Sequence, residues 1–208
     1  MSTYKLYYYN IRGRAETSRM IFAQAGVAYE DIRFGLDVAS GMGDEKFKAS
    51  SPTGMMPVLE VDGKQLVGSG VIARFLGERF GMAGSNDIEN AKLAGIMDVM
   101  DDYRIRMIRW LTEKEEEKKA ALLKEFTEEH TPKYFGILEG ICKKSDSDWI
   151  YGDKPTYVDL LLYNYLCFTL SLMPNIKEDY PSLVKVKAAV EALPNVAKWL
   201  KERPVTDH

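Results

Sequence analysis

A tyrosine, an arginine and the start of a helix follow one another within the first sixteen residues. Tyr8 lies in an aromatic-rich stretch, residues 4–9, which predicts a strand. Residues 10–13 (Asn-Ile-Arg-Gly) predict a turn, and Arg14 opens a helix predicted over 14–25. A tyrosine hydroxyl at a strand end, beside a helix N-terminus and an arginine, can stabilise an anion.

Each of these residues also has a purely structural interpretation. Alternation along a strand places Tyr7 and Tyr9 on one face and Tyr8 on the other, where Tyr8 can serve packing alone. Arg14 can form a surface ion pair, which contributes little to stability. The residues by themselves therefore leave both interpretations open.

Composition narrows the class of protein. The 208 residues carry a net charge of −3, which argues against a general nucleic-acid binder. No apolar run approaches the ~20 residues that span a bilayer, and the N-terminus lacks the apolar core of a signal peptide. Cys142 and Cys167 form no CxxC or zinc spacing, so we expect reduced, buried thiols in a cytoplasmic protein.

The N-terminal third alternates strands and helices around the candidate residues. Gly26 fits the end of the first helix, Ser69 fits an N-cap, and an Asp-Gly pair at 62–63 predicts a hairpin. The predicted order is strand 4–9, helix 14–25, strand 28–34, a weak helix 43–49, a two-stranded hairpin 57–67 and helix 70–79.

From residue 87 onward the pattern predicts helices alone. A capping-box-like start at 156–159 (Thr-Tyr-Val-Asp) introduces a very apolar helix, and Pro181 and Pro194 lie near the starts of the last two helices. The earlier helices are predicted over 87–111 and 114–143, and the apolar one over 160–172. We therefore predict an α/β domain over 1–80, a linker at 81–86 and an all-α domain over 87–208.

Together, these motifs resemble cytosolic glutathione transferases. The start of the chain (Tyr8 and 10–16) is similar to that of the sigma class, which includes glutathione-dependent prostaglandin D synthases and cephalopod S-crystallins. Further similarity lies in segments 56–63, 72–76, 97–102, 156–159 and 201–204. The resemblance implies an α/β plus all-α fold, with a thioredoxin-like βαβαββα domain followed by a helical domain.

The resemblance also implies what the anion is. A free thiol has a pKa above neutrality, and its thiolate is the nucleophile. The Tyr8 hydroxyl would donate a hydrogen bond to the glutathione sulfur, and the charge of Arg14 would favour the same thiolate. Glutathione would be a co-substrate, with no permanently bound cofactor.

The rest of glutathione would be held by further residues implied by the family. A cis bond at Met56-Pro57 would turn the Met56 backbone toward the peptide, and Ser69 would hold the γ-glutamyl carboxylate. Lys48 would pair with the glycine carboxylate. Asp102 would reach the γ-glutamyl amine of glutathione bound to a neighbouring subunit, which requires a homodimer; its alternative is a solvated helix acid.

A second set of residues would meet the electrophile. The pocket is expected between Tyr8 and the first long helix, although the same side chains can also be core or dimer contacts. These side chains are Tyr103, Arg106, Met107, Arg109 and Trp110. Asp98 and Asp101 could hold a divalent ion, as in prostaglandin D synthases, but helix acids are more often solvated, and we expect no metal.

The sequence departs from the family pattern at two places. The family has a Gln-Ser pair where this sequence has Gly68-Ser69. The change removes one side-chain amide contact to the glutamyl backbone of glutathione. The segment 37–48 is longer than usual, and this loop lacks the tryptophan of the class. Both departures predict a weaker or reshaped hold on glutathione.

The predicted function is conjugation of glutathione to hydrophobic electrophiles, without nucleic-acid or membrane partners. Two alternatives share the scaffold: a glutathione-dependent prostaglandin isomerase, and a structural S-crystallin-like protein with little activity. A thioredoxin-like oxidoreductase is disfavoured because the predicted N-terminal domain contains no cysteine.

Overall fold

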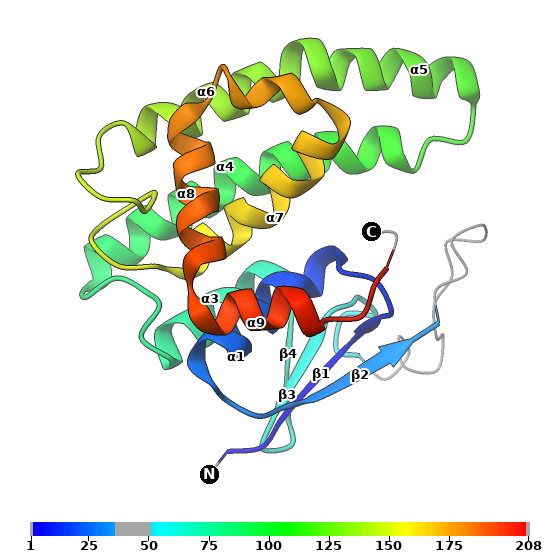
Figure 1. Ribbon diagram of the computed structural model, residues 1–208. Coiled ribbons are helices and arrows are strands. Elements are labelled where there is room, and N and C mark those ends of the chain that lie inside the picture. Colours follow the sequence, from blue (N-terminus) through cyan, green and yellow to red (C-terminus); the bar gives the residue numbers. More distant parts are fainter. Residues whose placement is uncertain (1, 36–50, 207–208) are drawn as a thin grey trace. The chain divides into compact units, whose positions relative to one another are not determined.

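The computed structural model describes residues 2–35 and 51–206, whose elements form two compact units (Figure 1). One unit comprises Met1–Met82 together with Glu191–His208, and the other comprises Ala83–Val190. The first break lies within the segment 81–86, but the C-terminal helix joins the first unit. The limits 1–80 and 87–208 therefore stay a prediction of the sequence.

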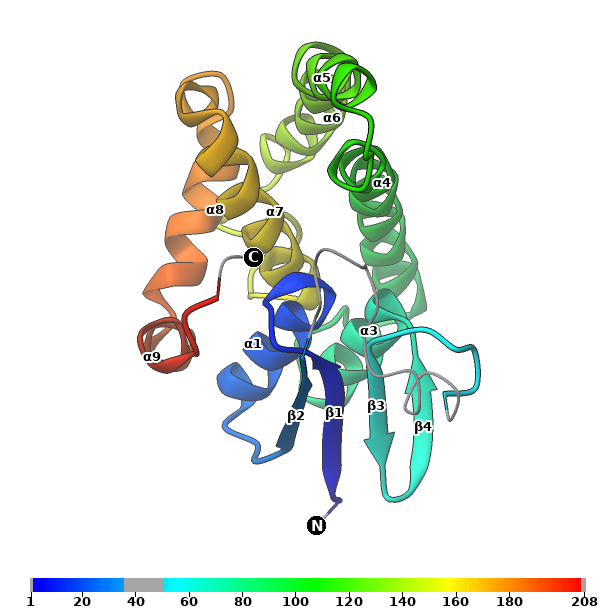
Figure 2. The same ribbon diagram turned by 90° about the vertical axis from the view of Figure 1, so that its right-hand side faces the viewer.

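A four-stranded mixed sheet forms the centre of the first unit (Figure 2). Its strands are β1 (Tyr4–Tyr9), β2 (Glu30–Phe34), β3 (Val58–Val61) and β4 (Lys64–Val67), in the order β2-β1-β3-β4. β1 pairs in parallel with β2 and antiparallel with β3, which continues antiparallel into β4. The hairpin turns at Asp62 and Gly63, both with positive φ, as the Asp-Gly pair predicts.

Four helical segments pack in the part of this unit that the structure describes. They are η1 (Gly13–Ala15), α1 (Glu16–Ala25), α3 (Ser69–Arg79) and α9 (Pro194–Glu202), and α1 contacts both α3 and α9. α1 ends at Gly26, whose φ of 65° gives the left-handed C-cap that the sequence predicts. The weak helix at 43–49 and Lys48 lie outside the described residues.

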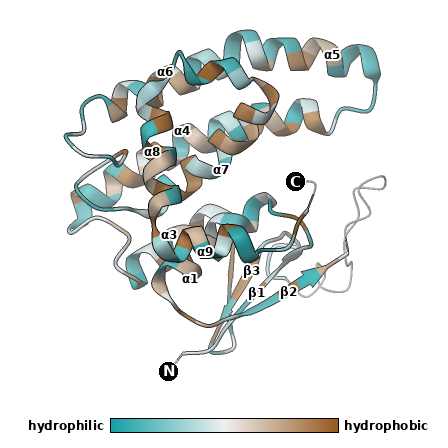
Figure 3. Cartoon of the chain, in the orientation of Figure 1, coloured by the Kyte–Doolittle hydropathy of each residue, from teal (hydrophilic) through white to brown (hydrophobic). Residues whose placement is uncertain are grey.

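All elements described in the second unit are helical. They are α4 (Asp87–Leu111), α5 (Glu116–Glu125), η2 (Phe126–His130), α6 (Thr131–Cys142), α7 (Tyr157–Leu172), η3 (Pro174–Lys177) and most of α8 (Pro181–Ala192). The thioredoxin-like and all-helical fold classes are thus confirmed. None of the residues in α5 is buried, and Figure 3 shows this helix mainly in the hydrophilic colour.

The helix predicted over 114–143 is interrupted by the π-helical turn η2. Pro132 has no backbone N–H to donate to the carbonyl four residues earlier, and the turn before it is π-helical: the Phe126 carbonyl accepts the Thr131 backbone N–H and also the Thr131 hydroxyl, the latter at 2.9 Å. The sequence predicts one helix here that Pro132 can bend, and the structure has helical segments that follow one another without a gap from Glu116 to Cys142, with the irregular turn directly before Thr131 and Pro132. Within residues 2–35 and 51–206, no helix combines the length and apolar composition that crossing a membrane requires.

A buried carboxylate anchors the start of α7. The capping box predicted at 156–159 is present: the Thr156 N–H donates to Asp159 at 2.8 Å. The same side chain accepts the N–H of Ile150, also at 2.8 Å. Burial outweighs these hydrogen bonds and raises the pKa of Asp159 to about 6.

Candidate functional site

Tyr8 lies near the end of β1 with only 6% of its surface exposed. Its phenolic oxygen accepts a hydrogen bond of 3.1 Å from the backbone N–H of Arg14. Burial raises the pKa of Tyr8, although this hydrogen bond and the charges of Arg14 and Arg19 act in the opposite direction. Tyr8 therefore stays protonated near neutral pH and can donate its own proton to a ligand.

Gly13 lets the turn pack closely against the Tyr8 ring, because it has no side chain. Its φ is +41°, and a Cβ added there would lie 2.9 Å from the Tyr8 oxygen and 3.0 Å from Cε1. Any side chain at this position would therefore displace the tyrosine ring or the turn. The sequence marks Gly13 as a turn residue, but nothing local predicts its contact with Tyr8.

Arg14 joins the turn to α3. Its Nε donates to the hydroxyl of Ser69 at 3.1 Å, and both residues are only partly buried. The expectation that Ser69 is the N-cap was wrong: Gly68 takes that place with a φ of 99°, and Ser69 is the first helical residue. The glycine that replaces the family glutamine thus has a backbone conformation that favours glycine.

The Met56-Pro57 segment lies against the same region. Its peptide bond is cis, and both residues are buried. The Pro57 carbonyl accepts the N–H of Gly68 at 3.4 Å. Three segments that are distant in sequence, around Tyr8, Met56 and Ser69, are thereby linked within the first unit.

The α4 residues that were predicted to contact glutathione or the electrophile differ from one another in exposure. Asp102 is exposed, and Met107 is half-buried. Arg109 is exposed and lies 3.8 Å from a carboxylate oxygen of Glu125. Trp110 is buried against Phe126, with ring centroids 5.9 Å apart.

The structure corrects the role that the sequence predicts for Tyr103. It is fully buried, and its hydroxyl lies 2.8 Å from that of Thr169 and 3.3 Å from that of Thr131. Its ring packs on Phe126 and Phe135. A side chain without exposed surface and with its hydroxyl engaged belongs to the helical core, so we remove Tyr103 from the expected electrophile pocket.

The acidic segment of α4 shows no metal-binding geometry. Asp98 is exposed, and Asp101 forms an ion pair of 2.9 Å with Arg104. In the part of the chain that the structure describes, no three His, Cys, Asp or Glu side chains lie together as metal ligands.

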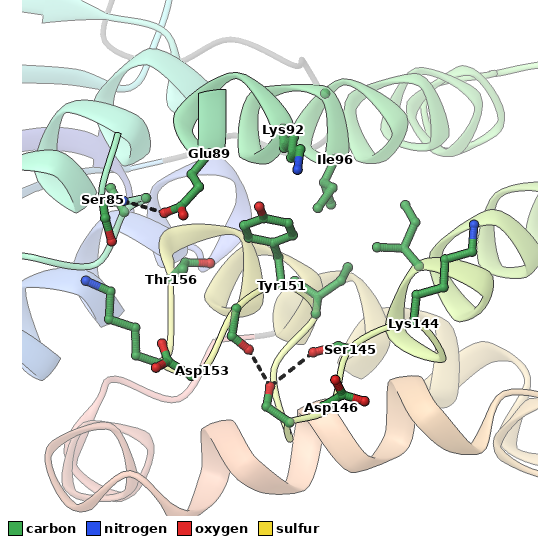
Figure 4. Close-up of a pocket in the computed structure, with 18 residues that line it drawn as sticks. Ser85, Glu89, Lys92, Ile96, Lys144, Ser145, Asp146, Tyr151, Asp153 and Thr156 are labelled. Atoms are coloured by element: carbon green, nitrogen blue, oxygen red, sulfur yellow. Dashed lines mark hydrogen bonds between the residues drawn. The ribbon is translucent and has the colours of Figure 1, made fainter. Parts of the chain in front are cut away.

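A cavity of about 1010 Å³ lies elsewhere, within the helical unit. It is lined by the start of α4, the end of α6 and the loop that precedes α7. Figure 4 shows Lys92 and Ile96 opposite Tyr151, and the Lys92 ammonium lies 5.5 Å from the Tyr151 ring centre. None of the described residues predicted to bind glutathione lines this cavity, so it is separate from the candidate site.

Comparison with known families shows to which family the chain belongs. Residues 4–78 match the family described as "Glutathione S-transferase, N-terminal domain", and residues 101–203 match "Glutathione S-transferase, C-terminal domain". The chain belongs to the glutathione S-transferase family. It is accordingly a glutathione transferase with glutathione as co-substrate, as the motifs predict.

Relatives of this family match the chain over its full length. It is 36% identical over 211 residues to glutathione S-transferase 1 of Ascaris suum, covering 100% of both proteins. It is also 36% identical over 208 residues to the hematopoietic prostaglandin D synthase of Gallus gallus, covering 99% of each. The solved structure of a monomeric glutathione S-transferase from Necator americanus matches with a TM-score of 0.87 at 35% identity, covering 99% of this chain and 100% of that chain.

Proposed function

We propose that this transferase activates glutathione through the Tyr8 hydroxyl. The observation that carries the proposal is the hydrogen bond from the Arg14 N–H to the Tyr8 oxygen. Because the oxygen accepts this bond, its proton remains available for the glutathione sulfur. Donation to sulfur stabilises the thiolate over the thiol, and the Arg14 guanidinium adds to the favourable field.

The remaining glutathione groups would be held by residues linked to the same turn. Ser69, at the start of α3, offers its hydroxyl and the helix N-terminus to the γ-glutamyl carboxylate. The Met56 backbone, next to Pro57, would pair with the peptide of glutathione. Lys48, which lies outside the described residues, would meet the glycine carboxylate, and this assignment rests on the resemblance to the family alone. The family membership and the links among the described segments support the assignments of Ser69 and Met56.

The electrophile would contact Met107, Arg109 and Trp110. The half-buried Met107 and the edge of the largely buried Trp110 suit hydrophobic electrophiles, and we propose that conjugation of such compounds serves detoxification in the cytoplasm. We further propose the sigma class, on the similarity to a prostaglandin D synthase. A homodimer in which Asp102 reaches the partner's glutathione completes the proposal, although one relative is described as monomeric.

Glutathione-dependent isomerisation is the second candidate. It is supported by the prostaglandin D synthase, which is as similar to this chain as the nematode transferase. Both reactions would begin with the same thiolate. Conjugation consumes glutathione in proportion to product, whereas isomerisation returns it unchanged, so measuring glutathione against product distinguishes the two.

Binding and turnover measured together test the proposal against a structural, S-crystallin-like role. Calorimetric titration with glutathione is combined with conjugation of an aromatic electrophile, chlorodinitrobenzene. The proposal predicts saturable binding and a rate that depends on glutathione. Absence of binding at millimolar glutathione would favour the structural protein.

A further inference from the structure

Arg19 lies directly behind the turn that carries Gly13 and Arg14. It is fully buried, and its Nη1 donates to the carbonyls of Ile11 at 2.8 Å and Arg12 at 3.3 Å. Its guanidinium carbon lies 5.9 Å from the centre of the Tyr8 ring. A buried cation thus holds the backbone of the turn whose next residues touch the tyrosine.

Two carboxylates hold Arg19 in place. Asp31 on β2 accepts its Nε at 3.1 Å and also pairs with Arg33 at 2.7 Å. Glu16 on α1 approaches its Nη1 at 3.3 Å and is itself only 1% exposed. Arg19 and Glu16 are buried and Asp31 is partly exposed, so removing Glu16 leaves the buried Arg19 charge less well compensated, and the arrangement tolerates little displacement.

Glu16 extends this arrangement to the C-terminal helix. Its other oxygen accepts the indole N–H of Trp199 and an N–H of Arg203, both at 2.9 Å. Trp199 lies on α9, and Arg203 caps its end. The contacts join positions 183 and 187 residues apart in sequence, within one compact unit.

We propose that Glu16, held by Trp199 and Arg203, is a positioning residue that lets α9 fix the orientation of the Tyr8 hydroxyl through Arg19 and the turn 11–14. The proposal rests on the proposed role of Tyr8. α9 therefore does more than cover α1: its end sets the geometry in which Tyr8 donates to the glutathione sulfur. Loss of either donor to Glu16 loosens Arg19 and the carbonyls that it holds.

The test uses the full-length protein with Arg203→Met and Trp199→Phe, which keep most apolar packing. Lys201→Met is the matched control, since it removes an exposed cation from the same helix end. With glutathione saturating, the pH dependence of kcat/KM for the electrophile reports the pKa of the enzyme-bound thiol. We expect this pKa to rise by about 0.5 to 1 unit and kcat to fall about fivefold, with KM for glutathione little changed.

Two further variants distinguish a positioning role from a general loss of stability. Arg203→Lys retains the cation and should restore part of the lost rate. In Tyr8→Phe, adding Arg203→Met should cost almost nothing further, because the coupled hydroxyl is already absent. A full additional loss in the double variant, or unchanged pH profiles in Arg203→Met and Trp199→Phe, would overturn the coupling. Unchanged activity in Tyr8→Phe alone would instead overturn the proposed role of Tyr8.

Discussion

The Tyr8 oxygen and the Arg14 backbone N–H lie 3.1 Å apart, with the tyrosine as acceptor. This arrangement determines what the hydroxyl can do, because accepting one hydrogen bond leaves its own proton to be donated. Burial raises the pKa of Tyr8, so the group acts as a hydrogen-bond donor rather than as a base. The tyrosine can therefore stabilise an anion beside it without changing its protonation state.

Replacing Gly13 with alanine tests how closely the turn must approach Tyr8. The added Cβ would meet the Tyr8 oxygen at 2.9 Å, and φ is +41°. We expect a loss of about 2 kcal/mol in the free energy of unfolding. We also expect kcat/KM to fall about 100-fold, since misplacement of a reacting group costs that much. Urea denaturation and steady-state kinetics measure the two effects.

Gly63→Ala is the matched control for that variant. Gly63 also has positive φ, at 78°, but no atom lies within 4 Å of its added Cβ. Its substitution should reduce stability while folded molecules keep normal activity. Equal losses of activity in both variants would show that backbone strain alone, and not contact with Tyr8, explains the effect.

Removal of the Ser69 hydroxyl tests its link to Arg14. Ser69→Ala deprives the Arg14 Nε of its acceptor at 3.1 Å and removes a proposed contact with the γ-glutamyl carboxylate. KM for glutathione should rise about tenfold, equivalent to about 1.4 kcal/mol, with a smaller change in kcat. Ser182→Ala in α8 is the control, because Ser182 contacts Glu139 through its backbone N–H. An unchanged KM in Ser69→Ala would contradict the binding role.

The stability of the helical unit should depend on pH through Asp159. Its folded pKa of about 6 lies above the unfolded value of 3.8, so the unfolded chain ionises first as pH rises. The stabilisation is complete below about pH 4 and is lost as pH rises through about 6. The free energy of unfolding of wild type, measured relative to that of Asp159→Asn, should therefore fall by about 1 to 3 kcal/mol as pH rises across this range.

Urea denaturation at several pH values measures this change in the free energy of unfolding. The exposed Asp153 offers a matched substitution, Asp153→Asn, in the loop that leads to α7. That variant should follow wild type at every pH. A constant difference between wild type and Asp159→Asn over pH 4 to 6.5 would contradict the pKa shift.

Local sequence patterns predicted most of the framework that carries the site. β1 occupies the predicted residues, and the Asp-Gly hairpin and the end of α1 at Gly26 were predicted from residues that act within a few positions. α4 likewise follows its predicted bounds. These features depend on backbone preference and periodicity, which a single sequence displays directly.

The features that the sequence did not predict depend on contacts between segments that are distant in the chain. The Ser69 hydroxyl meets Arg14 across 55 residues, and the Glu16 carboxylate meets Trp199 across 183. The burial of Tyr103 depends on three other helical segments packed around it. Residue type alone does not distinguish a buried tyrosine of the core from one that lines a pocket, since tertiary packing decides between them.

Tyr8→Phe tests the central claim most directly, because it removes only the hydroxyl and keeps the ring that packs beside Gly13 and Arg19. Conjugation kinetics as a function of pH would be measured together with calorimetric binding of glutathione. The account predicts a fall in kcat/KM of about 100-fold and a higher pKa of the bound thiol, with Kd for glutathione changed less than about threefold. A variant that conjugates within about twofold of wild type, with an unchanged thiol pKa, would contradict it.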